Sequence, residues 1–365
     1  MTDPRPLCMV VRPSLRSSQA GGDEVVYRRT IEYLSRGFRV VTLELGETSR
    51  IGKYLGIVRG NPPEATRYLN PENARRLSQA IARERPDVVC FFNEVSFPFS
   101  QVARDQGLLC VLLAHNVHSL VAASDPGWFS RLLRPLAVAF ERRWYADPSA
   151  ILVCLSQADV EGLHAAGIGR AAILAPPGAP PSVVLDADAK VVEELVLLGS
   201  YAWWRKRRDL RAFVRDTAFE VPVWASDPIA LGELGMRGRA IACDAPRWSG
   251  AMRFGLVTDR FRGGFKLKST EYVAMNCIVL SYSDISREFE GLPHADRFIR
   301  TVRSASDIRE AMADIASGET DETRARFLEF KAACLQRYDW QTCLKPLGEA
   351  IGARLAQRGA SARAP

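Results

Sequence analysis

Residues 263–281 read Gly-Gly-Phe-Lys-Leu-Lys-Ser-Thr-Glu-Tyr-Val-Ala-Met-Asn-Cys-Ile-Val-Leu-Ser, which is the pattern of a glycine loop, a short helix and a buried strand. Glycines let a backbone approach a ligand closely, and the first turn of a helix offers unpaired N–H groups. Lys266 and Lys268 place cations in that turn, where each costs about 0.3 to 1 kcal/mol unless an anion offsets it. The stretch predicts a phosphate site, with Glu271 placed to accept hydrogen bonds from sugar hydroxyls. An ordinary strand–helix unit with solvated lysines is the alternative.

The order of glycine loop, Lys-x-Lys and glutamate before Tyr-Val-Ala-Met-Asn-Cys-Ile-Val-Leu-Ser resembles the donor-binding segment of GT-B glycosyltransferases, and more narrowly glycosyltransferase family 4. The resemblance implies that Glu271 holds the ribose of a nucleotide-sugar and that Lys266 and Lys268 hold its diphosphate. Many members have a second glutamate eight residues earlier, facing the donor sugar, where this chain has Gly263. A non-catalytic protein that binds nucleotide-sugars or glycans therefore stays an alternative.

Length and composition favour two globular domains in a reducing compartment. A chain of 365 residues is about twice the size of a usual domain, and 47% apolar residues are enough for two cores. There is no run of eighteen apolar residues, and residues 1–13 do not resemble a signal peptide, so we expect a cytoplasmic protein without a spanning helix. The eight cysteines include no C-x-x-C pair, as expected for free thiols.

The net charge and the histidine content limit the classes of ligand that we expect the protein to bind. The net charge of +7 favours an anionic partner, for which a nucleotide, an acidic lipid and nucleic acid all qualify. The chain has four histidines, and the pair His115 and His118 has no convincing third metal ligand. We therefore expect no metal and no resident cofactor, with the nucleotide-sugar acting as a co-substrate.

The N-terminal half reads as the strands and helices of a parallel sheet. A strand at residues 7–11, the Gly21-Gly22 pair, a helix ending at Gly37 and a strand at 39–45 form a βαβ unit. The glycine pair is either a plain tight turn or a loop that receives a phosphate. Resemblance to family 4 implies that Gly21 and Gly22 face the diphosphate across an interdomain cleft. We further expect an irregular segment at 46–70, helices at 71–85 and 97–106, and strands at 88–92, 108–114 and 150–155.

His115 is the catalytic candidate of this half. It follows the apolar strand at 108–114, and open parallel sheets place their ligands beyond the carboxyl ends of strands. The family resemblance implies a histidine here that points at the transferred sugar or the acceptor. The alternative is a histidine bonded to a loop carbonyl.

Residues 125–145 combine tryptophans, aliphatic residues and arginines in a helix-permissive run that Pro135 interrupts. Such a mixture can lie in a membrane interface with its arginines at the lipid head groups. Trp128 to Tyr145 is therefore a candidate contact with the anionic inner face of a membrane. The commoner outcome is a long helix packed on its own domain.

A proline-rich linker at 176–190 precedes the second half. After a strand at 194–198, Ser200 opens the run Tyr-Ala-Trp-Trp-Arg-Lys-Arg-Arg that leads into a helix. The resemblance implies that a basic residue here contacts the diphosphate, and we assign that role to Lys206, with Arg205 as the alternative. The four cations beside two tryptophans are also compatible with single-stranded nucleic acid, which we rank lower because one cluster gives no track for a polymer.

We therefore predict an α/β protein of the GT-B fold, in which two Rossmann-like domains face a central cleft. The expected function is a metal-independent hexosyltransferase that moves a sugar from a nucleotide-sugar to an acceptor hydroxyl, and the resemblance to family 4 implies retention of anomeric configuration. A lipid-linked saccharide is the first candidate acceptor, in polysaccharide or glycolipid biosynthesis. The predicted divisions are an acceptor domain at 1–180, a donor domain at 190–340, a returning helix at 341–357 and a disordered tail at 358–365. The predicted site residues are His115, Lys206 and Lys268 for catalysis, and Gly21, Gly22, Ser200, Lys206, Lys266, Lys268 and Glu271 for donor binding.

Overall fold

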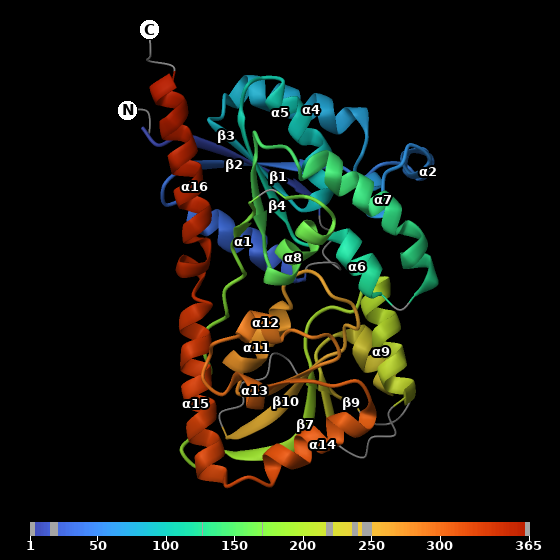
Figure 1. The fold of residues 1–365 in the computed structure, drawn as a ribbon, viewed down its shortest axis with the longest axis vertical. Helices are drawn as coiled ribbons and strands as arrows, with labels where there is room; N and C mark the ends of the chain where they lie inside the picture. The colour runs from blue at the N-terminus through green and yellow to red at the C-terminus, as the bar shows by residue number, and fades with distance from the viewer. Residues whose placement is uncertain are drawn as a thin grey trace.

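The computed structural model has two α/β domains, which lie one above the other in Figure 1. It describes residues 4–14, 21–125, 127–169, 171–216, 222–235, 240–242 and 250–361. Within these ranges each domain has a six-stranded sheet, and all the paired strands run parallel. The predicted α/β class with two such domains is confirmed.

The N-terminal sheet has the strand order β2-β1-β3-β4-β5-β6. Its strands are continuous apolar runs because helices cover both faces, and every residue of β3 and β4 is buried. The strands are β1 Leu7–Pro13, β2 Arg39–Leu45, β3 Val88–Phe92, β4 Leu109–Ala114, β5 Ile151–Cys154 and β6 Ile173–Leu174. The helices are α1 Gly22–Leu34, α2 Arg50–Val58, α3 Pro63–Thr66, α4 Pro71–Glu84, the 3₁₀ helix η2 Glu94–Phe99, α5 Ser100–Arg104, α6 His118–Ser124, α7 Trp128–Trp144 and α8 Gln157–Ala165.

Two sequence predictions for this domain are wrong. The segment 46–70, expected to be irregular, contains α2 and α3. Ile51, Tyr54, Leu55 and Val58 follow the spacing of one helical face, but the glycines and prolines of the segment favoured an irregular chain, and that apolar face is exposed. The helix expected at 97–106 is divided, because Pro98 lies in the 3₁₀ helix and regular helix begins only at Ser100.

The C-terminal sheet has the order β12-β11-β10-β7-β8-β9. Its strands are β7 Lys190–Leu197, β8 Val223–Ala225, β9 Ala240–Ala242, β10 Ala251–Val257, β11 Cys277–Ser281 and β12 Ile299–Thr301. The helices of this domain are α9 Trp204–Asp216, α10 Pro228–Gly235, α11 Leu267–Ala274, α12 Ser286–Phe289, α13 Ala295–Phe298 and α14 Ala305–Ala316. The sequence also predicts a strand at 240–243, and its last residue, Cys243, lies outside the described residues.

The strand orders place a switch point in each sheet. In the C-terminal sheet the chain leaves β7 toward β8 on one side, and it leaves β10 toward β11 on the other. In the N-terminal sheet the same divergence occurs between β1, which leads to β2, and β3, which leads to β4. Ligands of open parallel sheets bind at the carboxyl ends of the strands that flank such a point.

The last two helices link the domains. Figure 1 shows α15 Thr320–Arg337 and α16 Trp340–Ser361 as one column along the side of both domains, with α16 beside α1. Close to where α16 begins, the Ala179 N–H donates to the Tyr338 carbonyl at 2.7 Å. Because α16 continues through Ser361, residues 358–361 are helical and the predicted disordered tail is wrong there; residues 362–365 lie outside the described part of the chain.

Several classes of feature are absent from the part of the chain that the structure describes. None of its helices combines the length and the hydropathy needed to cross a bilayer. Its histidines, cysteines and carboxylates form no cluster of three or more suited to hold a metal ion. The seven described cysteines are all buried thiols.

Candidate functional site between the domains

Lys268 lies at the switch point of the C-terminal sheet. Gly199 follows β7 with a φ of 77°, and a Cβ added there would lie 2.6 Å from Cε of Lys268, so the lysine stem packs directly on this glycine. The ammonium lies 4.1 Å from the centroid of the Tyr201 ring. Its Nζ is buried and has no hydrogen-bond partner, and burial lowers the pKa of Lys268. This cation is therefore held without the acceptor that a buried ammonium needs.

Asp259 follows the neighbouring strand β10 and is almost fully buried. Lys266 lies with its Nζ 3.8 Å from Asp259 Oδ2, donates to the Gly263 carbonyl at 3.0 Å and stands over the Phe261 ring. Burial opposes the ionisation of Asp259, but the charges of Lys206, Lys266 and Lys268 hold its pKa below the ordinary value. The carboxylate of Asp259 thus interacts with three ammonium groups.

Lys206 and Glu271 complete this cluster. Lys206 lies in the first turn of α9, partly buried, and its charge acts on Glu271 and on Asp23 of the N-terminal domain. Burial raises the pKa of Glu271, against the charges of Lys268 and Lys206. Ser200 is partly exposed beside Gly199, and its Oγ accepts the Ala202 N–H at 3.3 Å. The residues predicted for the donor site on this domain therefore lie together.

The Gly21-Gly22 pair faces this cluster from the other domain. Gly21 is the N-cap of α1, and no side chain caps the helix. A Cβ added to Gly22 would lie 3.3 Å from Cδ2 of Leu267, the first residue of α11. The uncapped N-termini of α1 and α11 therefore meet at the boundary between the domains, where both offer backbone N–H groups to an anion.

His115 lies beyond the carboxyl end of β4, as predicted, and it is buried. Its Nδ1 lies 3.0 Å from an oxygen of Asp23, and its Nε2 is buried without a hydrogen-bond partner. Burial opposes the imidazolium, but the charge and hydrogen bond of Asp23 outweigh it and raise the pKa of His115. The partner that the structure assigns to this histidine is thus a carboxylate and not a loop carbonyl.

The buried Glu94 and a second histidine, His118, hold the loop that carries His115 in place. Glu94 accepts the backbone N–H of His115 at 3.1 Å, and its other oxygen lies 2.8 Å from Nε2 of His118. Burial opposes the ionisation of Glu94, while the His118 charge lowers its pKa. The His115 loop is therefore fixed by charge-assisted contacts to β3's carboxyl end.

Gly263 and Gly264 pack against the N-terminal domain. The Gly264 N–H donates to both oxygens of the buried Asp159 at 3.1 Å, and Asp159 also accepts the Val117 N–H at 3.0 Å. A Cβ at Gly263 would lie 2.9 Å from Cγ2 of Val121, and both glycines have positive φ. Because a side chain has no room at position 263 in this arrangement, the glutamate that many family 4 members have there could not be accommodated.

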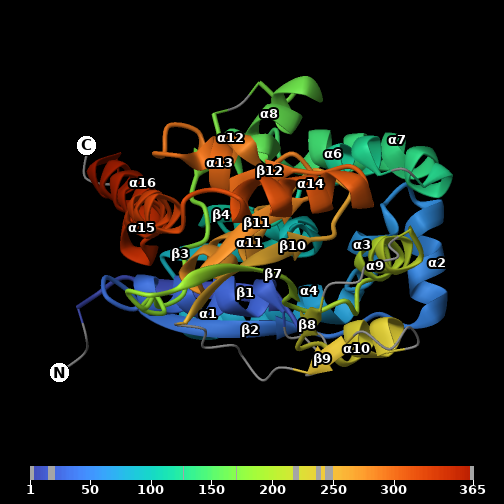
Figure 2. The same ribbon diagram turned by 90° about the horizontal axis from the view of Figure 1, so that it is seen from below.

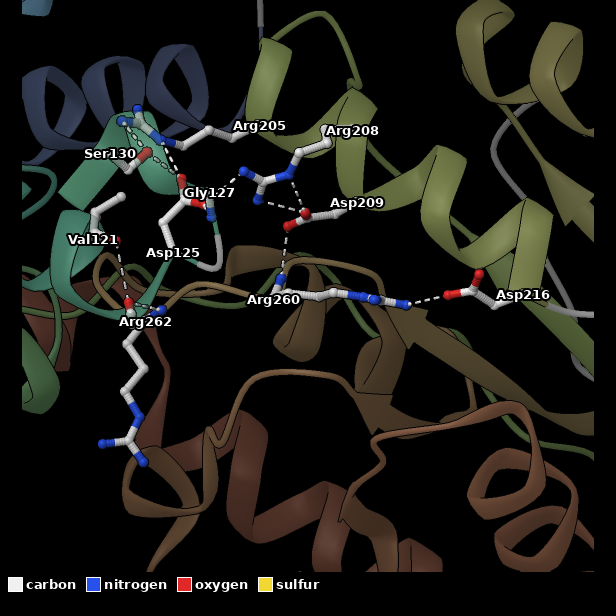
Figure 3. Close-up of polar contacts among 11 residues, drawn as sticks. Val121, Asp125, Gly127, Ser130, Arg205, Arg208, Asp209, Asp216, Arg260 and Arg262 are labelled. Carbon is white, nitrogen blue, oxygen red and sulfur yellow. Dashed lines mark hydrogen bonds and ion pairs between the residues drawn. The ribbon is translucent and has the colours of Figure 1, made fainter. Parts of the chain in front are cut away.

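A second group of cations lies on the same boundary but is fully paired. Asp125, which is completely buried, binds Arg205 Nε at 2.9 Å and Arg208 at 2.6 Å (Figure 3). The Ser130 hydroxyl and the Gly127 N–H donate to the same carboxylate at 2.6 and 2.8 Å. Arg205, our alternative to Lys206, is therefore committed to an interdomain ion pair and does not join the lysine cluster.

The contacts continue from Arg208 into the loop after β10. Arg208 also pairs with Asp209 at 2.7 Å, and Asp209 accepts the backbone N–H of Arg260 at 2.8 Å. The backbone N–H of Arg262 donates to Ser124 Oγ at 2.8 Å, while its side chain points away from Asp125 in Figure 3. These bonds tie the loop that carries the lysines to α6 and α9.

Comparisons with known proteins agree with this geometry. Residues 20–181 match the family model described as Glycosyltransferase Family 4. Sucrose-phosphate synthase from Thermosynechococcus elongatus has a similar structure, with a TM-score of 0.69 and 13% identity over 96% of this chain and 99% of that chain. The chain has the GT-B fold. This result confirms the predicted fold, and the match over residues 20–181 agrees with the resemblance to family 4.

Two further structures match the GT-B chain over nearly its whole length. HepE of Anabaena, in complex with UDP and glucose, has a TM-score of 0.62 and 13% identity over 94% of this chain and 99% of that chain. The lipopolysaccharide outer core galactosyltransferase WaaB has a TM-score of 0.56 and 14% identity over 95% and 99%. No curated protein sequence matches the chain.

Sequence reasoning missed four carboxylates of this boundary: Asp23, Asp125, Asp159 and Asp259. The sequence positions of two of them, Asp259 and Asp23, could have indicated a functional role. Asp259 follows the carboxyl end of a strand, and Asp23 directly follows the glycine pair in the first turn of a helix. Asp125 and Asp159 gave no signal of a role between the domains, because the residues that they bind across the boundary lie far away in the sequence.

Proposed function

We propose that this GT-B protein transfers a sugar from a nucleotide-sugar to an acceptor hydroxyl. The observation that carries the proposal is the buried, unpartnered ammonium of Lys268, which lies with Lys206 and Lys266 at the switch point where two helix N-termini meet. A diphosphate supplies the acceptor that Lys268 lacks. The UDP complex of HepE supports the choice of ligand.

In this proposal Glu271 binds the ribose hydroxyls, and the three lysines bind the diphosphate. The lysines stabilise the charge that develops on the diphosphate as the glycosidic bond breaks, which is the task a divalent cation performs in other transferases. We therefore propose a metal-independent reaction. A hydrogen bond to a charged group contributes about 1.5 to 3 kcal/mol, so the loss of one lysine slows turnover about tenfold to a hundredfold.

His115 orients the donor sugar or its developing charge. Its raised pKa favours the protonated ring, and Asp23 holds Nδ1, so Nε2 is left as a donor. The resemblance to family 4 supports retention of anomeric configuration, a reaction in which the departing phosphate itself takes the proton of the acceptor hydroxyl. His115 need not act as the base.

A lipid-linked saccharide is the acceptor that we propose, and the anionic face of a membrane is the expected surface, contacted through Trp128 to Tyr145. The basic net charge and the composition of α7 support this choice. WaaB, a lipopolysaccharide outer core galactosyltransferase, offers a structural parallel.

A non-catalytic nucleotide-sugar-binding protein is the second candidate. It is favoured by Gly263, since the family glutamate is missing and Val121 leaves no room for it. Nucleic acid is a weaker candidate still, because Arg205 and Arg208 of the Trp203–Arg208 cluster are engaged with Asp125.

The test is a thermal-shift screen against nucleoside diphosphates and nucleotide-sugars, followed by assays of donor hydrolysis and transfer. A ligand at a hundred times its Kd raises the free energy of unfolding by about 2.7 kcal/mol. Stabilisation with turnover supports the enzyme. Stabilisation without hydrolysis or transfer to any acceptor fraction supports the binding protein, and no stabilisation by any nucleotide contradicts both.

A further inference from the structure

Large apolar side chains are exposed mainly on two helices of the N-terminal domain. In α2 they are Ile51, Tyr54, Leu55 and Val58, with exposed fractions of 74, 73, 50 and 84%. In α7 they are Trp128 and Leu132, at 75 and 65%. Among the described residues, only Val184, Trp204 and Leu328 are exposed large hydrophobics elsewhere. Exposed apolar residues concentrated in this way mark an interaction surface.

The packing of α2 shows why its apolar residues face outward. Ser49 caps the N-terminus of α2. The inner side of α2 contacts its own domain through Gly56, where an added Cβ would lie 2.6 Å from Cγ2 of Thr66. Gly56 is the one buried residue of α2. A helix of nine residues that buries only a glycine gains little from its own domain, so its apolar face is left for another partner.

The charges on these helices select the partner. Residues 50–58 contain no acidic residue, and the one acidic residue of α7, Glu141, is fully buried. The exposed charges of the two helices and of the adjoining Arg59 are cationic: Arg50, Arg59, Arg131, Arg134, Arg142 and Arg143. A surface that shows only apolar and cationic side chains is complementary to an anionic lipid bilayer, where aromatic and aliphatic groups enter the interface and arginines reach the head groups.

The two helices also have a suitable relative position. Figures 1 and 2 both place α2 and α7 at the same edge of the N-terminal domain. We propose that α2 and α7 together form one docking face for an anionic bilayer, with α2 as an anchor that the sequence did not indicate. This inference does not depend on sugar transfer, because the face is built before any donor or acceptor binds.

The experiment is sedimentation of the full chain, without nucleotide, with vesicles of phosphatidylcholine alone or mixed equally with phosphatidylglycerol. Wild type is expected to sediment with the mixed vesicles, and less so as salt is raised. The α2 variant Tyr54→Ser/Val58→Ser and the α7 variant Trp128→Ser/Leu132→Ser should each lower the partition coefficient about tenfold or more. The control Val184→Ser/Leu328→Ser removes exposed apolar residues elsewhere and should bind like wild type.

Each other outcome overturns the proposal. If wild type does not sediment with the anionic vesicles, or binds neutral vesicles equally well, the face formed by α2 and α7 does not bind an anionic bilayer specifically. If the α2 variant binds like wild type while the α7 variant does not, a single helix and not the joint face is responsible. If wild type self-associates through this face, as shown by a concentration-dependent mass that the α2 variant abolishes, the partner is a second copy. Unchanged thermal unfolding of the variants separates these results from misfolding, and donor hydrolysis in detergent-free buffer reports separately on the transferase proposal.

Discussion

Two groups of cations lie on the same boundary and look alike in the sequence, but their surroundings differ. Arg205 and Arg208 enclose Asp125, which also accepts bonds from Ser130 and Gly127, so its carboxylate is satisfied from both domains. Lys268 is buried beside Gly199 with an Nζ that has no acceptor. A buried charge with its partner in place holds a structure together, whereas a buried charge without one is available to a ligand.

The same comparison separates stability from binding. The arginine pair should matter chiefly to how tightly the domains associate, and the lysine cluster chiefly to how tightly a diphosphate is held. Substitutions that remove one function and leave the other are therefore the sharpest way to test the distinction.

The largest effect is expected from Asp125→Asn. It leaves the buried Arg205 without its counter-charge, which should lower the free energy of unfolding by about 3 to 5 kcal/mol. Denaturant unfolding measures this loss. The control is Asp284→Asn, which removes an exposed pair with Arg262 and should cost at most about 1 kcal/mol. Equal costs for the two variants would show that the Asp125 pairs do not bind the domains together.

Lys268→Met should lower turnover about tenfold to a hundredfold, because a buried donor to the diphosphate is lost. Its melting temperature should not fall, since the variant also removes an ammonium that is desolvated without a partner. Steady-state kinetics and thermal unfolding report the two quantities. Lys345→Met, at an exposed i,i+4 pair with Glu349, is the control and should change neither. A destabilised Lys268→Met protein with normal turnover would assign the lysine a structural role.

Gly199→Ala should weaken nucleotide binding several-fold by displacing the Lys268 stem, whose Cε lies 2.6 Å from the new Cβ. It should also lose about 1 to 2 kcal/mol of stability from its positive φ. Gly107→Ala is matched for this strain, with a φ of 70° and nothing within 4 Å of the added Cβ. Calorimetry with UDP and GDP should detect weaker binding only for the first variant; a similar loss in both would refute the displacement.

The smallest effect is a shift in a pH profile. The folded-state pKa of His115 is raised above the ordinary 6.5, so kcat/KM should fall as pH rises past that raised value. Asp23→Asn removes the charge that raises the pKa of His115, so the fall in kcat/KM should begin at a lower pH. The stability that the pair contributes is fully present below pH 6.5 and is lost as pH rises through the folded-state pKa, so the variant should differ from wild type mainly in acid. Identical limbs in both proteins would exclude a role for the pair in turnover.

The sequence predicted the features that depend on local pattern. Apolar runs such as 88–92 and 109–114 can only be strands buried between helix layers, and the Gly-Gly and Lys-x-Lys motifs fell where the chain leaves a strand or enters a helix. It did not predict α2, because the glycines and prolines of residues 46–70 favoured an irregular segment. Nor could it distinguish Arg205 from Lys206, since the pairing of Arg205 with Asp125 joins residues 80 positions apart.

The most direct measurement is a calorimetric titration of UDP and GDP into wild type, Lys268→Met and Arg208→Met under the same conditions. If the unpartnered lysine cluster is the diphosphate site, at least one nucleotide should bind wild type, Lys268→Met should lose about tenfold or more in affinity, and Arg208→Met should stay within about threefold of wild type. Binding that survives the loss of Lys268 but disappears with Arg208 would contradict the account.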